Sequence, residues 1–291
     1  MNYDMPLYRP PSEAYSMIFQ VTIGCSHNKC RFCYMYKTKR FRIRSIDAIR
    51  RDIEYVAGTG YEFDKVFLAD GDALVIRTDT MLGILRLIRE KLPFVKRVSA
   101  YANPSNILLK SEDELRSIRR AGLQMLYIGI ESGDDEILTL VDKGANASEI
   151  TESIIKAKRA GFQTSATVIL GLGGRERTKQ HCINTSKLIN EAHPDYLSLL
   201  TLMLGPFEEE YREETGGRWT PLDPIETLVE IRDIVKGVDK KGIVFRTNHA
   251  SNYLPLKGVI SEDKKRLIDI LNNAIENPEK APLKPEFLRG L

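Results

Sequence analysis

The sequence has no long hydrophobic run, few cysteines and almost no excess of charge of either sign. No stretch of about 18 apolar residues occurs, so no membrane-spanning helix is expected. The 43 Lys and Arg against 40 Asp and Glu leave a net charge of +3, which is too small to argue for nucleic-acid binding. The first residues contain neither a basic segment nor an apolar one, so no secretory signal is expected.

Apart from these absences, the overall composition is that of an ordinary globular protein. The 291 residues are 42% hydrophobic and 29% charged, which allows a substantial core and accommodates a single α/β barrel. No internal repeat, low-complexity block or long linker separates the chain into parts. We expect a proline-containing extended arm over residues 1–15, one domain over 16–260, and a C-terminal helix and tail over 261–291.

Three of the four cysteines, Cys25, Cys30 and Cys33, lie within nine residues. An odd number of thiols cannot pair into disulfides, and clustered cysteines without a secretory context favour a metal site in the reducing cytoplasm. Four thiolates would complete a 4Fe–4S cluster. Three thiolates would leave one iron of such a cluster without a protein ligand. A catalytic zinc site similarly leaves one coordination position open for water. A structural zinc site with His27 as the fourth ligand is the alternative.

Apolar runs of strand length alternate with segments of helical periodicity along the chain. This alternation calls for parallel strands joined by right-handed crossovers. Seven strands are expected, one fewer than in a closed eight-stranded barrel, so we predict an α/β partial barrel, with a doubly wound open sheet as the alternative. The expected strands are 17–23, 65–69, 97–102, 125–130, 163–170, 196–202 and 243–247, and the expected helices are 46–57, 78–91, 112–121, 148–160, 178–192, 225–241 and 263–275.

Residues suited to binding or catalysis follow the expected strands, where each strand ends. Ligands of α/β folds bind at these C-terminal strand ends. The coincidence of several such residues at one edge carries more weight than any single motif. The residues are Cys25, Asp70, Asn103, Glu131, Gly171, Leu204 and Asn248.

The cysteine segment resembles that of the radical S-adenosylmethionine (radical SAM) superfamily. Within it the chain is most similar to the branch that contains the oxygen-independent coproporphyrinogen oxidase-like and elongator or methylthiotransferase-like proteins. The family spacing is Cys-x3-Cys-x2-Cys. Here the first gap is one residue longer, and an aromatic residue, Phe32, precedes the last cysteine. The resemblance covers roughly residues 16–260 and is sharpest at 24–36. It implies a partial (β/α)6 TIM-like barrel with an additional C-terminal strand and helix.

The resemblance also implies the cofactors and the reaction. Cys25, Cys30 and Cys33 would hold a 4Fe–4S cluster, whose fourth iron chelates S-adenosyl-L-methionine. An electron, from a donor such as flavodoxin or ferredoxin, would cleave the cofactor to methionine and a 5′-deoxyadenosyl radical, which takes hydrogen from the substrate. The implied protein is therefore a cytoplasmic oxidoreductase.

Cofactor contacts are implied position by position. Asp70, Gly71 and Asp72 match the turn whose backbone meets the methionine amino group. Glu131 and Ser132 match the pair that reaches the ribose hydroxyls. Lys143 takes the place of an arginine for the methionine carboxylate, as a point charge without the bidentate fork. The remaining expected contacts are Phe32 and Tyr34 beside the cluster, Ile169 and Gly171 against adenine, and Asn103, Asn248, His249 and Asn252 for the substrate.

Other functions stay open at this stage. The same fold could carry a cluster or haem without turnover, as a carrier or chaperone. A small-molecule substrate is favoured over RNA, because no added RNA-binding module is present. The basic residues between Lys37 and Arg51 form either a solvated face or a surface for an anionic substrate. Cys182 is expected to be a small buried thiol, and His249 is equally compatible with a structural role.

Overall fold

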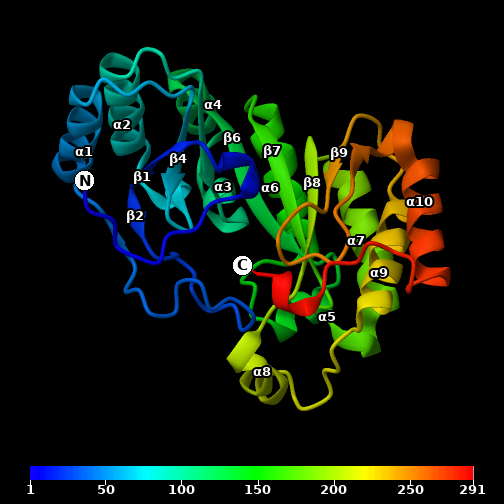
Figure 1. Cartoon of the computed structure of the whole chain (residues 1–291). Coiled ribbons are helices and arrows are strands. Elements are labelled where there is room, and N and C mark those ends of the chain that lie inside the picture. The colour runs from blue at the N-terminus through cyan, green and yellow to red at the C-terminus, as the bar shows by residue number, and fades with distance from the viewer. Residues whose placement is uncertain (291) are drawn as a thin grey trace. The chain divides into compact units, whose positions relative to one another are not determined.

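The computed structural model describes residues 1–290. These residues form two compact units. The first unit comprises residues 1–28, 33–128 and 153–164. The second comprises residues 29–32, 129–152 and the chain from 165 onward. Figure 1 shows the helices and strands along the chain.

The first unit is built on parallel strands that follow one another in the order β1, β4, β5 and β6. Phe19 and Phe67, on two of these strands, are completely buried, as expected of a parallel sheet with covered faces. The unit also contains a two-stranded antiparallel ribbon of β2 and β3. Its elements are β1 (Met17–Gln20), β2 (Thr22–Ile23), β3 (Arg42–Ile43), α1 (Ile46–Gly58), β4 (Lys65–Ala69), η2 (Ala73–Val75), α2 (Thr78–Lys91), β5 (Arg97–Tyr101), α3 (Pro104–Leu109), α4 (Glu112–Ala121) and most of β6 (Leu123–Glu131).

The N-terminal arm is anchored in this unit by a buried carboxylate. Glu13, in the short helix η1 (Pro11–Glu13), is fully buried. Its Oε1 accepts hydrogen bonds from the Tyr127 hydroxyl at 2.6 Å and from Arg97 Nη2 at 2.6 Å. Near the start of the arm, the Tyr3 hydroxyl donates to the backbone oxygen of Ile18 at 2.9 Å. These bonds hold the arm against strands β1, β5 and β6.

The second unit continues the alternation of strands and helices. Strands β7, β8 and β9 are parallel neighbours, and β10 closes the series antiparallel to β9. Helices α9 and α10 pack side by side, as Figure 1 shows. Helix α6 (Ala147–Arg159) starts in this unit and ends in the first. The other elements are α5 (Asp135–Leu140), β7 (Gln163–Leu170), α7 (Gly174–Ala192), β8 (Tyr196–Thr201), η3 (Gly205–Phe207), α8 (Glu208–Glu214), α9 (Pro224–Gly237), β9 (Val244–Arg246), β10 (Lys257–Val259), α10 (Ile260–Glu276) and η4 (Glu286–Leu288).

The helices form where the sequence supplies both a cap and an apolar stripe. Helix α4 begins with a capping box of Ser111 and Glu114, which satisfies two of the unpaired backbone N–H groups at a helix start. Helix α10 buries Leu267 and Leu271, four residues apart and hence on one face. Among residues 1–290, no helix combines the length and the apolar character needed to cross a bilayer.

The predicted fold class is confirmed: the protein is an α/β partial barrel of mostly parallel strands. Strands 65–69 and 163–170 and helix 78–91 have the predicted bounds. The single strand expected at 17–23 is wrong, because the chain divides at Val21 into two strands with different partners. The helix expected at 225–241 ends at Gly237. The sequence analysis also missed the short elements β3, β10, α3, α5 and α8.

Candidate functional site

In the first unit, the start of the cysteine loop is bonded to the turn after β4. Gly24, which precedes Cys25, has a φ of 73°, a conformation that favours glycine. Its N–H donates to Asp70 Oδ2 at 2.9 Å, and its carbonyl accepts from the N–H of Gly71 at 3.1 Å. The backbone N–H of Asp70 in turn donates to the carbonyl of Thr22 at 3.2 Å. Two segments far apart in sequence thus form one backbone framework around Cys25.

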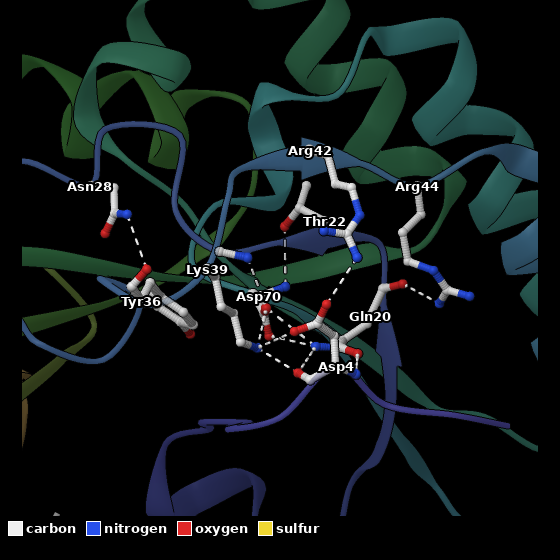
Figure 2. A network of polar contacts seen from close by, with 10 residues as sticks. Asp4, Gln20, Thr22, Asn28, Tyr36, Lys39, Arg42, Arg44 and Asp70 are labelled. Carbon is white, nitrogen blue, oxygen red and sulfur yellow. Dashed lines mark hydrogen bonds and ion pairs between the residues drawn. The ribbon is translucent and has the colours of Figure 1, made fainter.

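The carboxylate of Asp70 is the centre of this framework (Figure 2). It is fully buried, and Lys39, whose side chain is only 2% exposed, donates to its Oδ2 from Nζ at 2.9 Å. Gln20 Nε2 donates to the same carboxylate at 3.1 Å. Lys39 also donates to the backbone oxygen of Asp4 in the N-terminal arm, while Arg42 Nη2 bonds the Asp4 carboxylate at 2.9 Å. Through these hydrogen bonds, the Asp70 side chain stabilises the cysteine loop.

The carboxylate of Asp72 organises the other side of the loop. It accepts hydrogen bonds from the Ser26 hydroxyl at 2.6 Å, from Asn103 Nδ2 at 3.1 Å and from Asn106 Nδ2. Burial raises the pKa of Asp72, and these hydrogen bonds oppose the shift. Asn103 Nδ2 also lies 3.7 Å from Cys25 Sγ, within hydrogen-bonding range of the sulfur. The amide predicted to contact substrate thus reaches the first cysteine.

Tyr36 closes the packing around Cys25. A Cβ added to Gly71 would lie 2.8 Å from Tyr36 Cε2 and 3.0 Å from Cys25 Cβ, so only glycine fits between them. The Tyr36 hydroxyl is buried and has no hydrogen-bond partner within residues 1–290, and desolvation raises its pKa well above the usual value. Asn28, at a φ of 47°, donates from Nδ2 to the Tyr36 carbonyl at 3.0 Å. Asn28 thus provides a turn within the longer first gap.

The segment around the second cysteine belongs to the second unit. Arg31, next to Cys30, donates from its backbone N–H to the Val141 carbonyl at 2.9 Å and from Nη1 to the Leu140 carbonyl at 2.8 Å. All four cysteines lie within the described residues and none forms a disulfide. Cys25, Cys30 and Cys33 are half-buried, as are Phe32 and Tyr34. Within residues 1–290, no three His, Cys, Asp or Glu side chains already converge as ligands of a single metal ion.

Two predicted cofactor contacts of the second unit form an ion pair. Lys143 Nζ lies 2.8 Å from Glu131 Oε1, and the two side chains are 7% and 10% exposed. Glu131 has a φ of 60°, an unusual backbone conformation for a residue other than glycine. A Cβ at Gly129 would lie 2.0 Å from Glu131 Oε1, so this glycine makes room for the pair. The next helix, α5, is capped by Asp134 rather than by Glu131.

Ser132 is completely buried and is used within the protein. Its hydroxyl lies 2.9 Å from His181 Nδ1 and accepts the N–H of Asp134 at 3.0 Å. Which of Ser132 Oγ and His181 Nδ1 donates in this bond depends on the tautomer of the imidazole. Burial lowers the pKa of His181 to about 4. The ribose contact predicted for Ser132 stays a prediction. Sequence reasoning missed the bond to His181, because His181 lies inside a helical pattern.

Two buried side chains, those of Glu230 and Trp219, hold the turn after β7 in position through hydrogen bonds. The N–H of Gly171 donates to Glu230 Oε2 at 2.8 Å, and its carbonyl accepts from Trp219 Nε1 at 3.0 Å. The Thr178 hydroxyl donates to the other oxygen of Glu230 at 2.9 Å. No cation is paired with Glu230 in the described chain, and burial raises its pKa to about 7. Ile169, also predicted to meet adenine, is half-buried on β7.

The residues predicted to contact substrate after β9 differ in exposure. Asn252 is buried, accepts from the Thr201 N–H at 2.9 Å and donates to the Leu199 carbonyl at 2.7 Å, so it braces β8. His249 Nδ1 accepts from the Ser251 N–H at 3.1 Å, and burial lowers the His249 pKa. Asn248 is exposed. Asn252 is thus used within the protein, and the substrate contact predicted for it stays a prediction.

The basic stretch is partly internal rather than a continuous solvated face. Lys39 is buried against Asp70, while Arg44 Nη1 bonds Asp52 Oδ2 at 2.7 Å. The exposed members of the stretch include Lys37, Arg40, Arg50 and Arg51.

Cys182 is a buried thiol, as predicted, and burial raises its pKa far above the usual range.

The sequence pattern of the radical SAM superfamily matches residues 19–189, more than half of the chain. This protein belongs to the radical SAM superfamily. The matched range includes the cysteine loop, the Asp70 turn, the Glu131–Lys143 pair and the Gly171 turn described above.

Individual relatives of this radical SAM protein differ in what they do. The heme chaperone HemW of Bacillus subtilis is 24% identical over 72% of this chain and 56% of its own length. The oxygen-independent coproporphyrinogen III oxidase of Escherichia coli is 24% identical over 62% of this chain and 40% of its own length. The chain thus spans about half the length of these curated relatives.

Solved structures share the fold. Coproporphyrinogen III oxidase of Escherichia coli superposes with a TM-score of 0.58 at 20% identity, over 76% of this chain and 50% of the other. Methylornithine synthase superposes with a TM-score of 0.53 at 16% identity, over 88% of this chain and 80% of the other. At these identities the likeness establishes the partial-barrel fold of the radical SAM protein.

Removing the Asp70 carboxylate is expected to destabilise the protein strongly. In Asp70→Ala, Lys39 remains buried, and its other carboxylate neighbour, Asp4, lies 3.9 Å away. Loss of one partner of a buried pair costs about 3–5 kcal/mol of unfolding free energy. Glu112→Ala removes the exposed ion pair with Arg116 and should cost less than about 1 kcal/mol. Urea unfolding of both variants measures the difference; equal losses would contradict the role given to Asp70.

Replacing Glu230 is expected to change how stability depends on pH. Because burial raises its pKa from 4.5 to about 7, the folded protein binds the proton more tightly than the unfolded chain. Wild-type stability should therefore fall as pH rises through this range. Glu230→Gln keeps the shape without the charge and should gain up to about 3 kcal/mol relative to wild type above pH 7.

Thermal unfolding at about pH 5 and about pH 8 measures this gain. The matched control is Glu152→Gln, on the exposed surface of α6, which removes a carboxylate without touching the Gly171 turn. A Glu230→Gln variant whose stability relative to wild type is the same at both pH values would show that Glu230 has no raised pKa.

Proposed function

We propose that this protein is a radical SAM enzyme in which Cys25, Cys30 and Cys33 bind a 4Fe–4S cluster with one iron left for S-adenosylmethionine. The observation that carries the proposal is the framework around Cys25, in which the turn after β4 and Asn103 converge on the first cysteine. The family match, which includes all three cysteines, supports it. Cys25, Cys30 and Cys33 would hold the cluster, which would supply the one-electron chemistry for reductive cleavage of S-adenosylmethionine and removal of a hydrogen atom from the substrate.

The residues around Cys25 fit such a cluster. Three thiols at short spacing form a soft donor set suited to iron and sulfide. The Asn103 amide offers a hydrogen bond to Cys25 sulfur, and hydrogen bonds to cluster sulfurs are one means of setting the reduction potential. The buried Tyr36 hydroxyl lacks a protein partner within residues 1–290. It is therefore available to bond a group in the site.

Other residues are proposed to bind the cofactor. The backbone at Asp70, Gly71 and Asp72 would receive the methionine amino group, while their carboxylates hold the loop. Glu131 and Lys143, neutralised by each other, would offer one acceptor and one donor to the ribose and the methionine carboxylate. The segment from Ile169 to Gly171 would lie against adenine, its position determined by Glu230 and Trp219. The substrate is proposed to be a small molecule, with reduction by a flavodoxin or ferredoxin.

A second candidate is a cluster-carrying haem chaperone without turnover. The similarity to the heme chaperone HemW over 72% of this chain favours it. The same fold serves both roles, so the fold cannot separate them. Haem binding without cleavage of S-adenosylmethionine would distinguish the chaperone from the enzyme.

Cluster assembly and cofactor cleavage test the proposal together. Anaerobic reconstitution with iron and sulfide should give about four irons per chain, and dithionite with S-adenosylmethionine should then yield 5′-deoxyadenosine. Cys30→Ala should abolish product formation. Cys182→Ala, which removes a buried thiol in α7, is the matched control and should retain both iron and product. Equal product from wild type and Cys30→Ala, or one zinc per chain without iron, would overturn the proposal.

A further inference from the structure

The second unit contains a cavity of about 260 Å³ at the ends of two parallel strands. Leu170 and Gly171 line it from the end of β7, and Thr201 and Leu202 from the end of β8. Ligands of such α/β folds bind outside these C-terminal strand ends. The cavity therefore lies where the fold presents a ligand, and its volume is below the roughly 300–1,000 Å³ of pockets for drug-sized molecules.

One wall of the cavity comes from the C-terminal tail, for which the sequence had suggested no role. Arg289 and Glu286 of the tail line the cavity together with Tyr253. The Arg289 side chain is only 3% exposed, and its guanidinium lies 3.9 Å from the centre of the Tyr253 ring. Arg289 Nε donates to the Ser251 carbonyl at 2.7 Å, and Nη1 donates to the Glu286 carboxylate at 2.6 Å. The guanidinium is thus held in one orientation.

These bonds leave part of the guanidinium for a ligand. Arginine has five N–H donors in a planar fork. Within residues 1–290, Nε and Nη1 of Arg289 have protein acceptors, whereas Nη2 has none. Because Arg289 lines the cavity, a ligand that fills this space can accept from Nη2. Carboxylate is the acceptor group that best matches the fork geometry.

The rest of the lining limits the ligand further. Leu202, Leu204, Leu222 and Trp219 form an apolar surface, which suits a hydrocarbon or aromatic body. Glu208 and Glu286 also line the cavity, so the lining has two acidic residues against the one guanidinium, and each further negative charge on a ligand adds repulsion that Arg289 alone must offset. A phosphate ester or a dicarboxylate is therefore disfavoured. The lining matches a small apolar acid with a single carboxylate.

We infer that this cavity binds the carboxylate end of a small, apolar monocarboxylic substrate and that Arg289 is the residue that recognises it. The inference rests on the proposed function, because it takes the substrate site of the radical SAM enzyme to be at these strand ends. It assigns Arg289 a part in binding and makes the tail a wall of the site. Glu286 competes with the ligand for the same guanidinium.

A matched pair of probes tests the inference by calorimetry on the reconstituted protein. The probes are 3-phenylpropionate and 3-phenylpropanol, which differ in the carboxylate and share the apolar body. Wild type should bind the acid at least about tenfold more tightly than the alcohol, and Arg289→Gln should lose that preference. Lys284→Gln is the control in the same tail, since Lys284 Nζ bonds the Ala250 carbonyl and is absent from the lining; it should retain the preference.

Glu286→Gln supplies an independent result should Arg289→Gln fail to fold. It removes the competing anion and should raise affinity for the acid while leaving that for the alcohol unchanged. Equal wild-type affinities for acid and alcohol, no binding of either probe, or weaker acid binding in Glu286→Gln would each overturn the inference.

The same titration on Cys30→Ala separates this inference from the proposed function. Acid binding should persist in Cys30→Ala, because Cys30 does not line the cavity. Formation of 5′-deoxyadenosine by wild type without acid binding would contradict the carboxylate site and leave the enzyme proposal standing. Acid binding without 5′-deoxyadenosine would sink the enzyme proposal and leave the cavity as a binding site.

Discussion

A buried carboxylate must be matched by donors, and this requirement organises the segment around the first cysteine. Removing an ionised carboxylate from water costs several kcal/mol unless charge and hydrogen bonds compensate. Asp70 meets the condition with Lys39, Gln20 and the N–H of Gly24. Because the last of these donors precedes Cys25, the cost of burying Asp70 is offset only when the cysteine loop is in place. The stability of the first unit and the position of the first cysteine are therefore coupled.

The second unit meets the same requirement in two different ways. Glu131 has a cation, Lys143, at 2.8 Å. Within residues 1–290, Glu230 has only neutral donors, from Gly171 and Thr178, and burial raises its pKa to about 7. The first arrangement keeps two charged groups available at a strand end. The second holds a glycine turn in position, at the cost of a carboxylate that is unfavourable when ionised.

Membership of a superfamily does not by itself choose between enzyme and chaperone. The relatives include a heme chaperone and an oxidase at equal identity, and the chain matches about half of each. Function must then be argued from residues grafted onto the shared fold. In this chain the residues proposed for that role are the Cys25 framework, the Glu131–Lys143 pair and Arg289 beside its cavity. Arg289 comes from the tail, beyond the matched range 19–189, so the superfamily pattern assigns it no role.

The sequence by itself determined the features that depend on local pattern. Apolar runs and helical periodicity predicted strands 65–69 and 163–170 and helix 78–91, and the cysteine spacing pointed to the superfamily. Only the tertiary structure decided which polar residues support the site and which face it. Asp70 and Lys39 are 31 residues apart, and Gly171 and Glu230 are 59 apart. Local periodicity carries no information about such pairs, because burial and hydrogen bonding assign their roles only once the strands have brought them together.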